Sequence, residues 1–228
     1  MKNLFFIVLF MVGTNAFGQA TPKTAKSPAE FVPAGYVVFE KIQGDLNNDG
    51  QVDYVLIIKG TDRAYFVKDE NRGELDRNPR GIIIALKNKD RYELALDNRD
   101  CFTSENEDGG VYYAPELSVN INKGILLIHY AHGRYGYWTY KFRYQNSDFD
   151  LIGYESSQDH GPVVERSVSI NFMTKKILTR ENINQNAEAG DEKFKETSKK
   201  FTLSKPFKLR GMANFEGFDV EVLLGSVK

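Results

Sequence analysis

The sequence predicts a mainly β protein of antiparallel meander sheets, arranged as a sandwich or as a partial barrel or propeller, with one peripheral helix. Tyr and Phe occur 12 and 16 times while Trp occurs once, and this balance favours strands. Short apolar runs recur along the chain with turn residues between them, which gives about ten strands. Most connections are short and hairpin-like, apart from two long excursions at residues 61–80 and 97–115.

Four strands are expected in the first half of the chain, at residues 36–42, 54–58, 81–87 and 91–96. The second of these, Tyr-Val-Leu-Ile-Ile, is continuously apolar, which is typical of a strand covered on both faces. Ahead of them, Ser27, Pro28 and Glu30 have the spacing of a helix start with a capping box. About one helical turn is expected there, because Pro33 and Gly35 follow almost at once.

Six further strands are expected in the second half, at residues 116–121, 125–129, 137–145, 149–155, 163–172 and 177–180. Gly124 lies in the turn between the first two, where a positive φ is required. The charged segment 191–201 is predicted to be the peripheral helix, since its two aromatic residues are one heptad apart and share a face. Residues 218–225 are predicted to form a closing strand.

The strand at 137–145 has two different faces when it is divided by its period of two. One face is aromatic and is assigned to the core; it carries Trp138, Tyr140, Phe142 and Tyr144. The other face and the adjoining loop are amphiphilic and positive, and are a candidate surface for a sugar, an anion or a protein partner. The candidate partner-binding residues are Arg134, Tyr135, Tyr137, Lys141 and Arg143. An ordinary solvated sheet face is the alternative.

The N-terminus has the layout of a secretory signal peptide. Lys2 precedes an apolar run at 4–12, and small residues follow at Ala16, Gly18 and Ala20. Cleavage after Gly18 is preferred over cleavage after Ala20, and a membrane anchor or a buried N-terminal element is the alternative. The expected organisation is therefore a signal peptide at 1–18, a lead-in at 19–35 and one β-rich domain at 36–228. A boundary between two subsheets is expected near 97–115.

Composition excludes several classes. The formal net charge is -1 and no basic region stands out, so nucleic acid is a poor candidate partner. No segment after the signal is apolar and long enough to cross a membrane, so the mature chain is expected in the periplasm or outside the cell. The single cysteine, Cys101, cannot form an intramolecular disulfide, and burial is expected for it.

Residues 45–53 carry the strongest chemical signal, a predicted calcium loop. Calcium binds six to eight hard oxygen donors, which a tightly curled loop can supply from alternate positions. The candidate ligands are Asp45, Asn47, Asp49, the carbonyl group of Gln51, and Asp53. Gly50 allows the sharp bend. An EF-hand is excluded because Leu56, in an apolar strand, stands where the bidentate Glu would be. The alternative is an Asx-rich turn without metal.

This segment, GDLNNDGQVDYVLII, resembles the calcium motif of FG-GAP or VCBS-type repeats. The run RGIIIALKNKDRYELAL is similar to the following strands of such a blade, so the resemblance covers residues 42–96. The chain has one copy, whereas a propeller has roughly four or more blades. The segments FVPAGYVVFEKIQGDLNNDG and YKFRYQNSDFDLIGYE also resemble small secreted bacterial proteins of unknown function, a resemblance that implies no activity.

Two weaker groups of residues stand out. Glu105, Glu107 and Asp108 are candidates for a second cation site, with a solvated acidic loop as the favoured interpretation. Zinc ligation by the three histidines and Glu165 is disfavoured, because no H-E-x-x-H pattern is present. No nucleophile elbow, P-loop or dinucleotide fingerprint is present either.

The function expected from these observations is that of a secreted, non-enzymatic β protein. It would use structural calcium and would recognise a protein or a glycan through its surface. The first alternative is a periplasmic inhibitor or immunity-type protein that plugs another protein's active site. A less favoured alternative is a hydrolase of envelope polymers that uses acidic residues from the two excursions.

Overall fold

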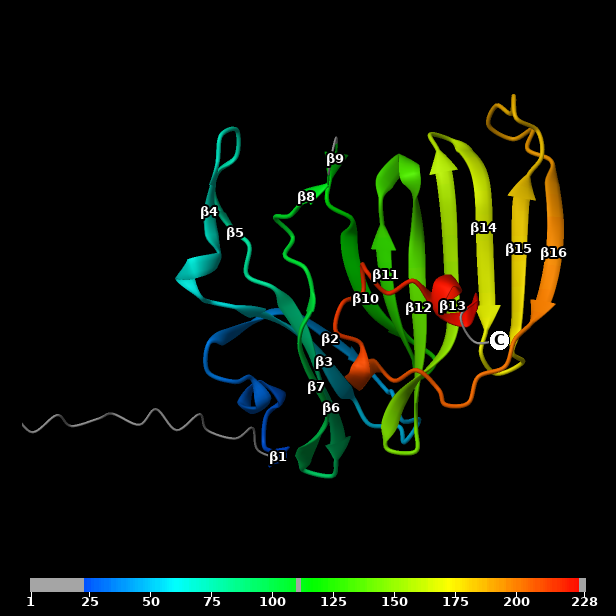
Figure 1. The fold of residues 1–228 in the computed structure, drawn as a ribbon. Coiled ribbons are helices and arrows are strands. Elements are labelled where there is room, and N and C mark those ends of the chain that lie inside the picture. Colours follow the sequence, from blue (N-terminus) through cyan, green and yellow to red (C-terminus); the bar gives the residue numbers. More distant parts are fainter. Residues whose placement is uncertain (1–22, 110–111, 226–228) are drawn as a thin grey trace, which may run out of the picture.

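The computed structural model describes residues 23–109 and 112–225, and it is mainly β (Figure 1). The first sheet has five strands, with bounds β1 Thr24–Ala25, β2 Tyr36–Gly44, β3 Asp53–Gly60, β6 Arg80–Asn88 and β7 Arg91–Phe102. Their order is β1-β7-β6-β3-β2, and every neighbouring pair is antiparallel. The predicted mainly β class and antiparallel meander are confirmed.

The second sheet has seven strands that follow one another in chain order from β10 to β16. Their bounds are β10 Glu116–Asn122, β11 Ile125–Ala131, β12 Gly136–Gln145, β13 Asp148–His160, β14 Val163–Asn171, β15 Lys176–Asn182 and β16 Phe194–Lys200. Two small hairpins occupy the long excursions, with bounds β4 Phe66–Asp69, β5 Gly73–Asp76, β8 Asp108–Gly109 and β9 Tyr112–Tyr113. The change from the first sheet to the second thus falls between the end of β7 and the start of β10.

Short helices accompany the strands. The 3-10 helices are η1 Pro28–Phe31, η2 Arg63–Tyr65, η3 Gly133–Tyr135 and η4 Leu209–Gly211, and the α-helix is α1 Val220–Gly225. The capping box at Ser27 and Glu30 is present at η1. Within the described residues, no helix has the length and apolar character needed to cross a membrane. Residues 1–22 lie outside the described residues, and with them the predicted signal peptide at 1–18 and the start of the predicted lead-in.

The central strand β3 is covered on both faces, as its apolar run predicts. Val55 and Ile57 belong to the main hydrophobic cluster, while Leu56 and Ile58 belong to a second, smaller cluster on the opposite face. Phe31 of η1 is fully buried in this second cluster. The segment ahead of β2 therefore caps one face of the first sheet.

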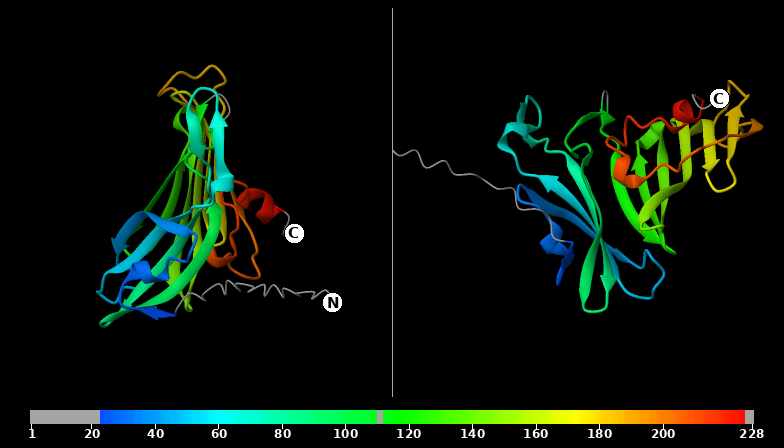
Figure 2. Two further views of the ribbon diagram at one scale, coloured as in Figure 1. Left: turned by 90° about the vertical axis from the view of Figure 1, so that its left-hand side faces the viewer. Right: turned by 60° about the horizontal axis from the view of Figure 1, so that its bottom comes forward.

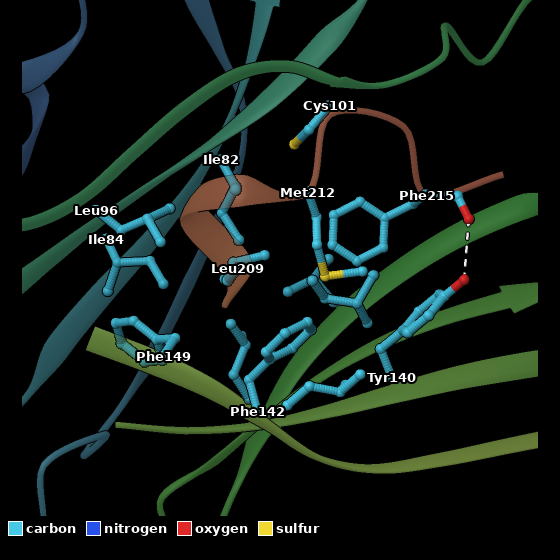
Figure 3. Packing of buried hydrophobic residues seen from close by; sticks show 14 of the residues in the cluster. Ile82, Ile84, Leu96, Cys101, Tyr140, Phe142, Phe149, Leu209, Met212 and Phe215 are labelled. Atoms are coloured by element: carbon cyan, nitrogen blue, oxygen red, sulfur yellow. Dashed lines mark hydrogen bonds between the residues drawn. The ribbon is translucent and has the colours of Figure 1, made fainter. Parts of the chain in front are cut away.

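The main cluster joins both sheets through the C-terminal segment. Leu209, Met212 and Phe215 pack between Ile82 of the first sheet and Phe142 of the second (Figure 3). Within the C-terminal segment, the Phe215 carbonyl group accepts a hydrogen bond of 3.0 Å from a buried tyrosine hydroxyl of β12 (Figure 3). The aromatic face predicted for residues 137–145 does face this core.

The two sheets meet at a corner and diverge from it (Figure 2). A Cβ atom on Gly44, at the end of β2, would come within 2.8 Å of the Ile121 side chain on β10. Only glycine allows this approach, so Gly44 sets how closely the two sheets meet.

Two predicted elements are wrong. Residues 191–201 do not form a helix, because Phe194–Lys200 pairs along its whole length with β15 as the edge strand β16. Arg180 lies 4.3 Å from the ring of Phe194, and these cross-strand contacts override the helix propensity of a charged segment. The predicted closing strand at 218–225 contains α1 instead. The Asp219 carboxylate accepts a hydrogen bond from Val222 N at 2.9 Å, which is an N-capping contact.

Candidate functional site

The predicted calcium loop connects β2 to β3 at the corner between the sheets. Leu46 within it is 1% exposed and belongs to the main core. Asn48 adopts a positive φ of 60° and lies against Gly124 in the turn between β10 and β11. A Cβ atom on Gly124 would come within 2.7 Å of the Asn48 amide group. The loop is therefore in contact with both sheets.

Four of the five predicted ligand residues lie together in one hydrogen-bonded curl. The Asp45 carboxylate accepts hydrogen bonds from Asp49 N at 3.2 Å and Gly50 N at 2.8 Å. Asn47 Oδ1 accepts one from Asp49 N at 3.1 Å. The Asp49 carboxylate accepts from Gln51 N at 2.8 Å and from Asn47 Nδ2 at 3.0 Å. These bonds from Gln51 and Asn47 hold the pKa of Asp49 below its usual value.

Asp53, the fifth predicted ligand, is fully buried behind the curl and ties separate parts of the backbone together. Its Oδ2 accepts a hydrogen bond from Leu46 N at 2.8 Å, and its Oδ1 accepts one from Lys87 N at 2.7 Å. Burial raises the pKa of Asp53, and the nearby charges of Asp49 and Asp45 raise it further against the effect of these two bonds. The buried Asp53 carboxylate is therefore close enough to Asp45 and Asp49 to be repelled by their charges.

The described residues contain no group of three or more His, Cys, Asp or Glu side chains arranged to hold a metal ion. The Asp45 and Asp49 carboxylates are turned toward the loop's own N–H groups, and Asp53 also accepts from Lys87 N in β6. Each carboxylate oxygen has a second lone pair beyond the one that accepts such a bond. The amide oxygen of Asn47 and the carbonyl group of Gln51 are further hard donors of the kind that calcium uses.

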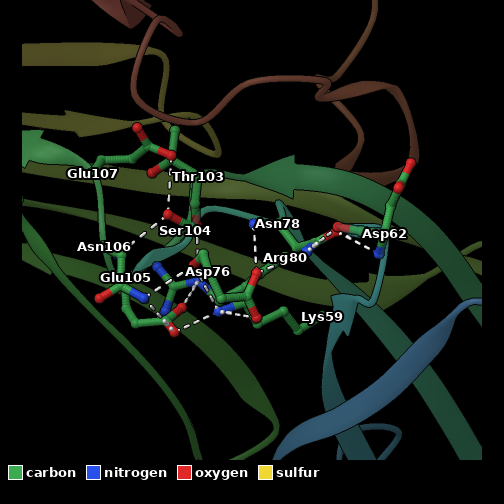
Figure 4. Close-up of polar contacts among 10 residues, drawn as sticks. All are labelled: Lys59, Asp62, Asp76, Asn78, Arg80, Thr103, Ser104, Glu105, Asn106 and Glu107. Atoms are coloured by element: carbon green, nitrogen blue, oxygen red, sulfur yellow. Dashed lines mark hydrogen bonds and ion pairs between the residues drawn. The ribbon is translucent and has the colours of Figure 1, made fainter. Parts of the chain in front are cut away.

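An ionic cluster around the buried Lys59, beside the hairpin of β4 and β5, was not predicted from the sequence (Figure 4). Lys59 Nζ lies 2.5 Å from Glu105 Oε1 and 3.1 Å from Asp76 Oδ2, and its side chain is 6% exposed. Arg80, also buried, donates from Nε to the Thr103 carbonyl group at 2.8 Å. Burial lowers the pKa of Arg80, and the charge of Glu105 opposes this effect. A lysine within an apolar strand, at the end of 54–59, is the sequence signal that could have revealed the cluster.

Asn78 extends the cluster into the hairpin. Its Nδ2 donates to Asp76 Oδ1 at 2.7 Å and to the Asp62 carbonyl group at 2.9 Å. Burial raises the pKa of Asp76, but the hydrogen bonds from Asn78 and the charge of Lys59 outweigh it and hold this pKa below the usual value. The cluster thus links β3, the hairpin and the chain after β7 into one polar unit.

The acidic residues proposed as a second cation site each have another partner. Glu105 pairs with Lys59, and Glu107 accepts a hydrogen bond from Ser104 Oγ at 2.9 Å. Asp108 Oδ1 lies 2.8 Å from Arg77 and 2.9 Å from a second arginine, Arg72. The charges of Glu105 and Asp108 are offset by cations, and Glu107 bonds to a neutral hydroxyl group, which favours the interpretation as a solvated loop.

The candidate partner-binding residues do not form one compact patch. Arg134 and Tyr135 are exposed in η3 at one end of β12, whereas Arg143 is near the other end of that strand. The six-residue separation of Tyr137 and Arg143 corresponds to roughly 20 Å along the strand. Lys141 Nζ pairs with Glu155 Oε1 at 2.6 Å, so the face is less positive than its sequence indicates.

His129, His132 and the cysteine are each in contact with, or buried among, neighbouring groups of the fold. His129 Nδ1 is 2.7 Å from the Thr139 hydroxyl group, and His132 lies against the Tyr135 ring at 5.3 Å. Cys101 is 1% exposed, which confirms its predicted burial. Burial raises the pKa of its thiol well above the usual value, so the thiolate is disfavoured.

Comparison with protein-family models, curated proteins and solved structures finds no match to this chain. The resemblance of residues 42–96 to FG-GAP or VCBS-type repeats therefore stays a prediction.

Proposed function

We propose that this chain is an exported, non-enzymatic binding protein whose sheet corner is stabilised by a calcium ion in loop 45–53. The observation that carries the calcium proposal is the curl in which Asp45, Asn47 and Asp49 are held together against both sheets. The loop supplies hard oxygen donors at alternate positions, which suits calcium.

Electrostatics supports a cation at this place. Asp45 and Asp49 raise the pKa of the buried Asp53, so both neighbouring carboxylates repel the ionised form of Asp53. A divalent cation would offset this repulsion. Extracellular calcium modules bind with dissociation constants of about 10⁻⁴–10⁻³ M. Free calcium at about one hundred or ten times the dissociation constant adds about 2.7 or 1.4 kcal/mol to the free energy of unfolding.

A binding role is favoured over hydrolysis by the surroundings of the excursion acids. Asp76 and Glu105 lie within ion-pair distance of Lys59, and Asp108 lies within that distance of two arginines. Acids paired in this way are poor candidates for a catalytic acid and base. The inhibitor or immunity-type role is a form of the binding function, and an enzyme that co-purifies with the exported protein would support it.

The calcium proposal is tested by thermal unfolding of the chain without residues 1–18, with calcium and with EGTA. We expect calcium to raise the melting temperature by about 3–11 °C, as about 2–4 °C per kcal/mol predicts for a domain of this size. Asp49→Ala should abolish this gain. Asp90→Ala, in the exposed turn after β6, is the matched control and should retain it. A calcium response that survives Asp45→Ala combined with Asp49→Ala would contradict the assignment.

The export proposal is tested by the intact mass of the protein recovered outside the cytoplasm. We expect loss of residues 1–18, or of residues 1–20 if cleavage follows Ala20. A retained N-terminus would contradict the proposal.

A further inference from the structure

A cavity of about 500 Å³ lies between the hairpin of β4 and β5, the chain after β7 and the C-terminal segment. Tyr65 and Val67 line it from the hairpin side, Phe102 and Ser104 from the chain around the end of β7, and Asn214 from the C-terminal segment. Its volume falls within the roughly 300–1,000 Å³ typical of small-molecule sites. It is separate from the loop at 45–53, none of whose residues line it.

The cavity combines an aromatic ring with polar groups. The Tyr65 side chain is 48% exposed, so a ring face is available for stacking. Arg77 donates through Nη2 to Asp108 at 2.8 Å, which holds its guanidinium group in place. Arg77 Nε is buried and has no hydrogen-bond partner among the residues that the structure describes. That atom has almost no accessible surface, so a ligand oxygen would instead accept from the accessible part of the guanidinium group, whose side chain is 23% exposed and lines the cavity.

The charges around the cavity favour a neutral ligand. Arg77 contributes one positive charge and Glu107 one carboxylate, whereas the Asp100 carboxylate accepts a hydrogen bond from the Tyr36 hydroxyl at 2.8 Å. Asp108, outside the lining, already pairs with the Arg77 guanidinium group. An anionic ligand would meet more negative than positive charge here. A hydroxyl group suits both kinds of partner, because it can accept from Arg77 and donate to Glu107.

The wall of the cavity is held in place from behind by the ionic cluster. Ser104 and Glu107 line the cavity and are hydrogen-bonded to each other, while Glu105 between them pairs with Lys59 in the cluster (Figure 4). Asn106 Nδ2 donates to the Asp76 carbonyl group at 3.0 Å. This stretch is therefore anchored on the side away from the cavity, and a site that is already formed loses less entropy when a ligand binds.

We propose that this cavity binds a neutral sugar, with Tyr65 stacking on the ring and Arg77 and Glu107 hydrogen-bonding its hydroxyl groups. The inference rests on the proposed binding function and names its ligand class and site. It does not depend on calcium.

The test uses saturation-transfer NMR and calorimetric titration of the chain without residues 1–18. The probes are glucose, galactose, N-acetylglucosamine and their β-linked disaccharides, with glucuronate as the anionic counterpart, each with calcium and with EGTA. We expect at least one neutral sugar to bind. Tyr65→Ala should weaken that binding roughly tenfold, the upper part of the range for aromatic contacts. Arg77→Lys, which keeps the charge beside Asp108 but removes the planar set of guanidinium donors, should also weaken it.

Arg63→Gln is the matched control, because Arg63 is 82% exposed beside the same hairpin and does not line the cavity. Melting curves of each variant establish that it is folded. The proposal is overturned if no neutral sugar binds, if glucuronate binds more tightly, or if folded Tyr65→Ala and Arg77→Lys bind as the parent does. Sugar binding without any calcium response would refute only the calcium proposal, and a calcium response without sugar binding would refute only this one.

Discussion

Replacing Asp53 by asparagine separates the structural role of this carboxylate from any role in metal binding. Asp53 is fully buried and accepts hydrogen bonds from Leu46 N and Lys87 N, which belong to the start of the loop and to the end of β6. Asparagine has nearly the same shape, but its amide nitrogen would face one of these two N–H groups. That N–H group would then be buried without an acceptor, and the other would lose its charged acceptor.

The expected cost follows from these two bonds. A hydrogen bond to a charged group contributes about 1.5–3 kcal/mol, and an unsatisfied buried donor costs about 1–3 kcal/mol. In the opposite direction, removing the charge relieves the burial and repulsion that raise the pKa of Asp53. We therefore expect Asp53→Asn to lower the free energy of unfolding by about 3 kcal/mol, which corresponds to a melting temperature lower by roughly 6–12 °C.

The assay is urea and thermal unfolding in excess EGTA, so that bound calcium contributes nothing to the difference. Asp45→Asn is the comparison, because the hydrogen bonds of Asp45 to Asp49 N and Gly50 N lie at the protein surface. It should cost less than about 1 kcal/mol under the same conditions. Equal losses for the two variants in EGTA would refute the assignment of Asp53 as a buried structural tie.

Three further predictions concern the ionic cluster, the core and a tyrosine. Lys59→Met should lower the free energy of unfolding by about 2 kcal/mol. This loss is smaller than that from breaking a fully buried ion pair, because Asp76 and Glu105 stay 30% and 35% exposed and can hydrate. In urea unfolding, adding Glu105→Gln should recover part of that loss, and a neutral or stabilising Lys59→Met would contradict the prediction. Phe215→Ala should cost about 3–5 kcal/mol by the same assay, since the centre of its buried ring lies 5.0 Å from that of Phe102. A loss below about 1 kcal/mol would show that the core does not depend on the C-terminal segment. Burial and the hydrogen bond to Asp100 raise the pKa of Tyr36 from 10.0 to about 12, so its stabilisation is complete below pH 10 and is lost as the pH rises toward 12. Between pH 10 and 12, Tyr36→Phe should therefore lose less stability than the parent protein. Parallel curves of unfolding free energy against pH would refute the coupling of Tyr36 ionisation to stability.

The strands were predicted well where local pattern and burial agree. The apolar run in β3 and the aromatic alternation in β12 both report directly on which face is buried. Prediction failed for β16 and α1, which lie near the end of the chain. The charged residues of β16 suit a helix by propensity, but the free edge of β15 supplies a full ladder of backbone partners. The short α1 depends on one capping contact from Asp219 and on packing against the core.

For the candidate sites, the sequence indicated residue types but not their orientation. Loop 45–53 was found because its ligand-type residues are neighbours in the chain, yet their spacing does not reveal that Asp53 faces Leu46 N and Lys87 N. The ionic cluster and the cavity were missed, because Lys59 and Glu105, or Tyr65 and Asn214, are brought together only by folding.

The sequence by itself determined the mainly β class, the positions of most strands, and the buried faces of β3 and β12, because hydrophobic periodicity is a local property of the chain. Only the tertiary structure decided how the two sheets meet at Gly44 and Ile121, how the C-terminal segment fills the space between them, and which charges pair in the interior. Those features depend on contacts between residues far apart in the chain, and the pairing of a buried charge is set by the partners that folding brings within reach.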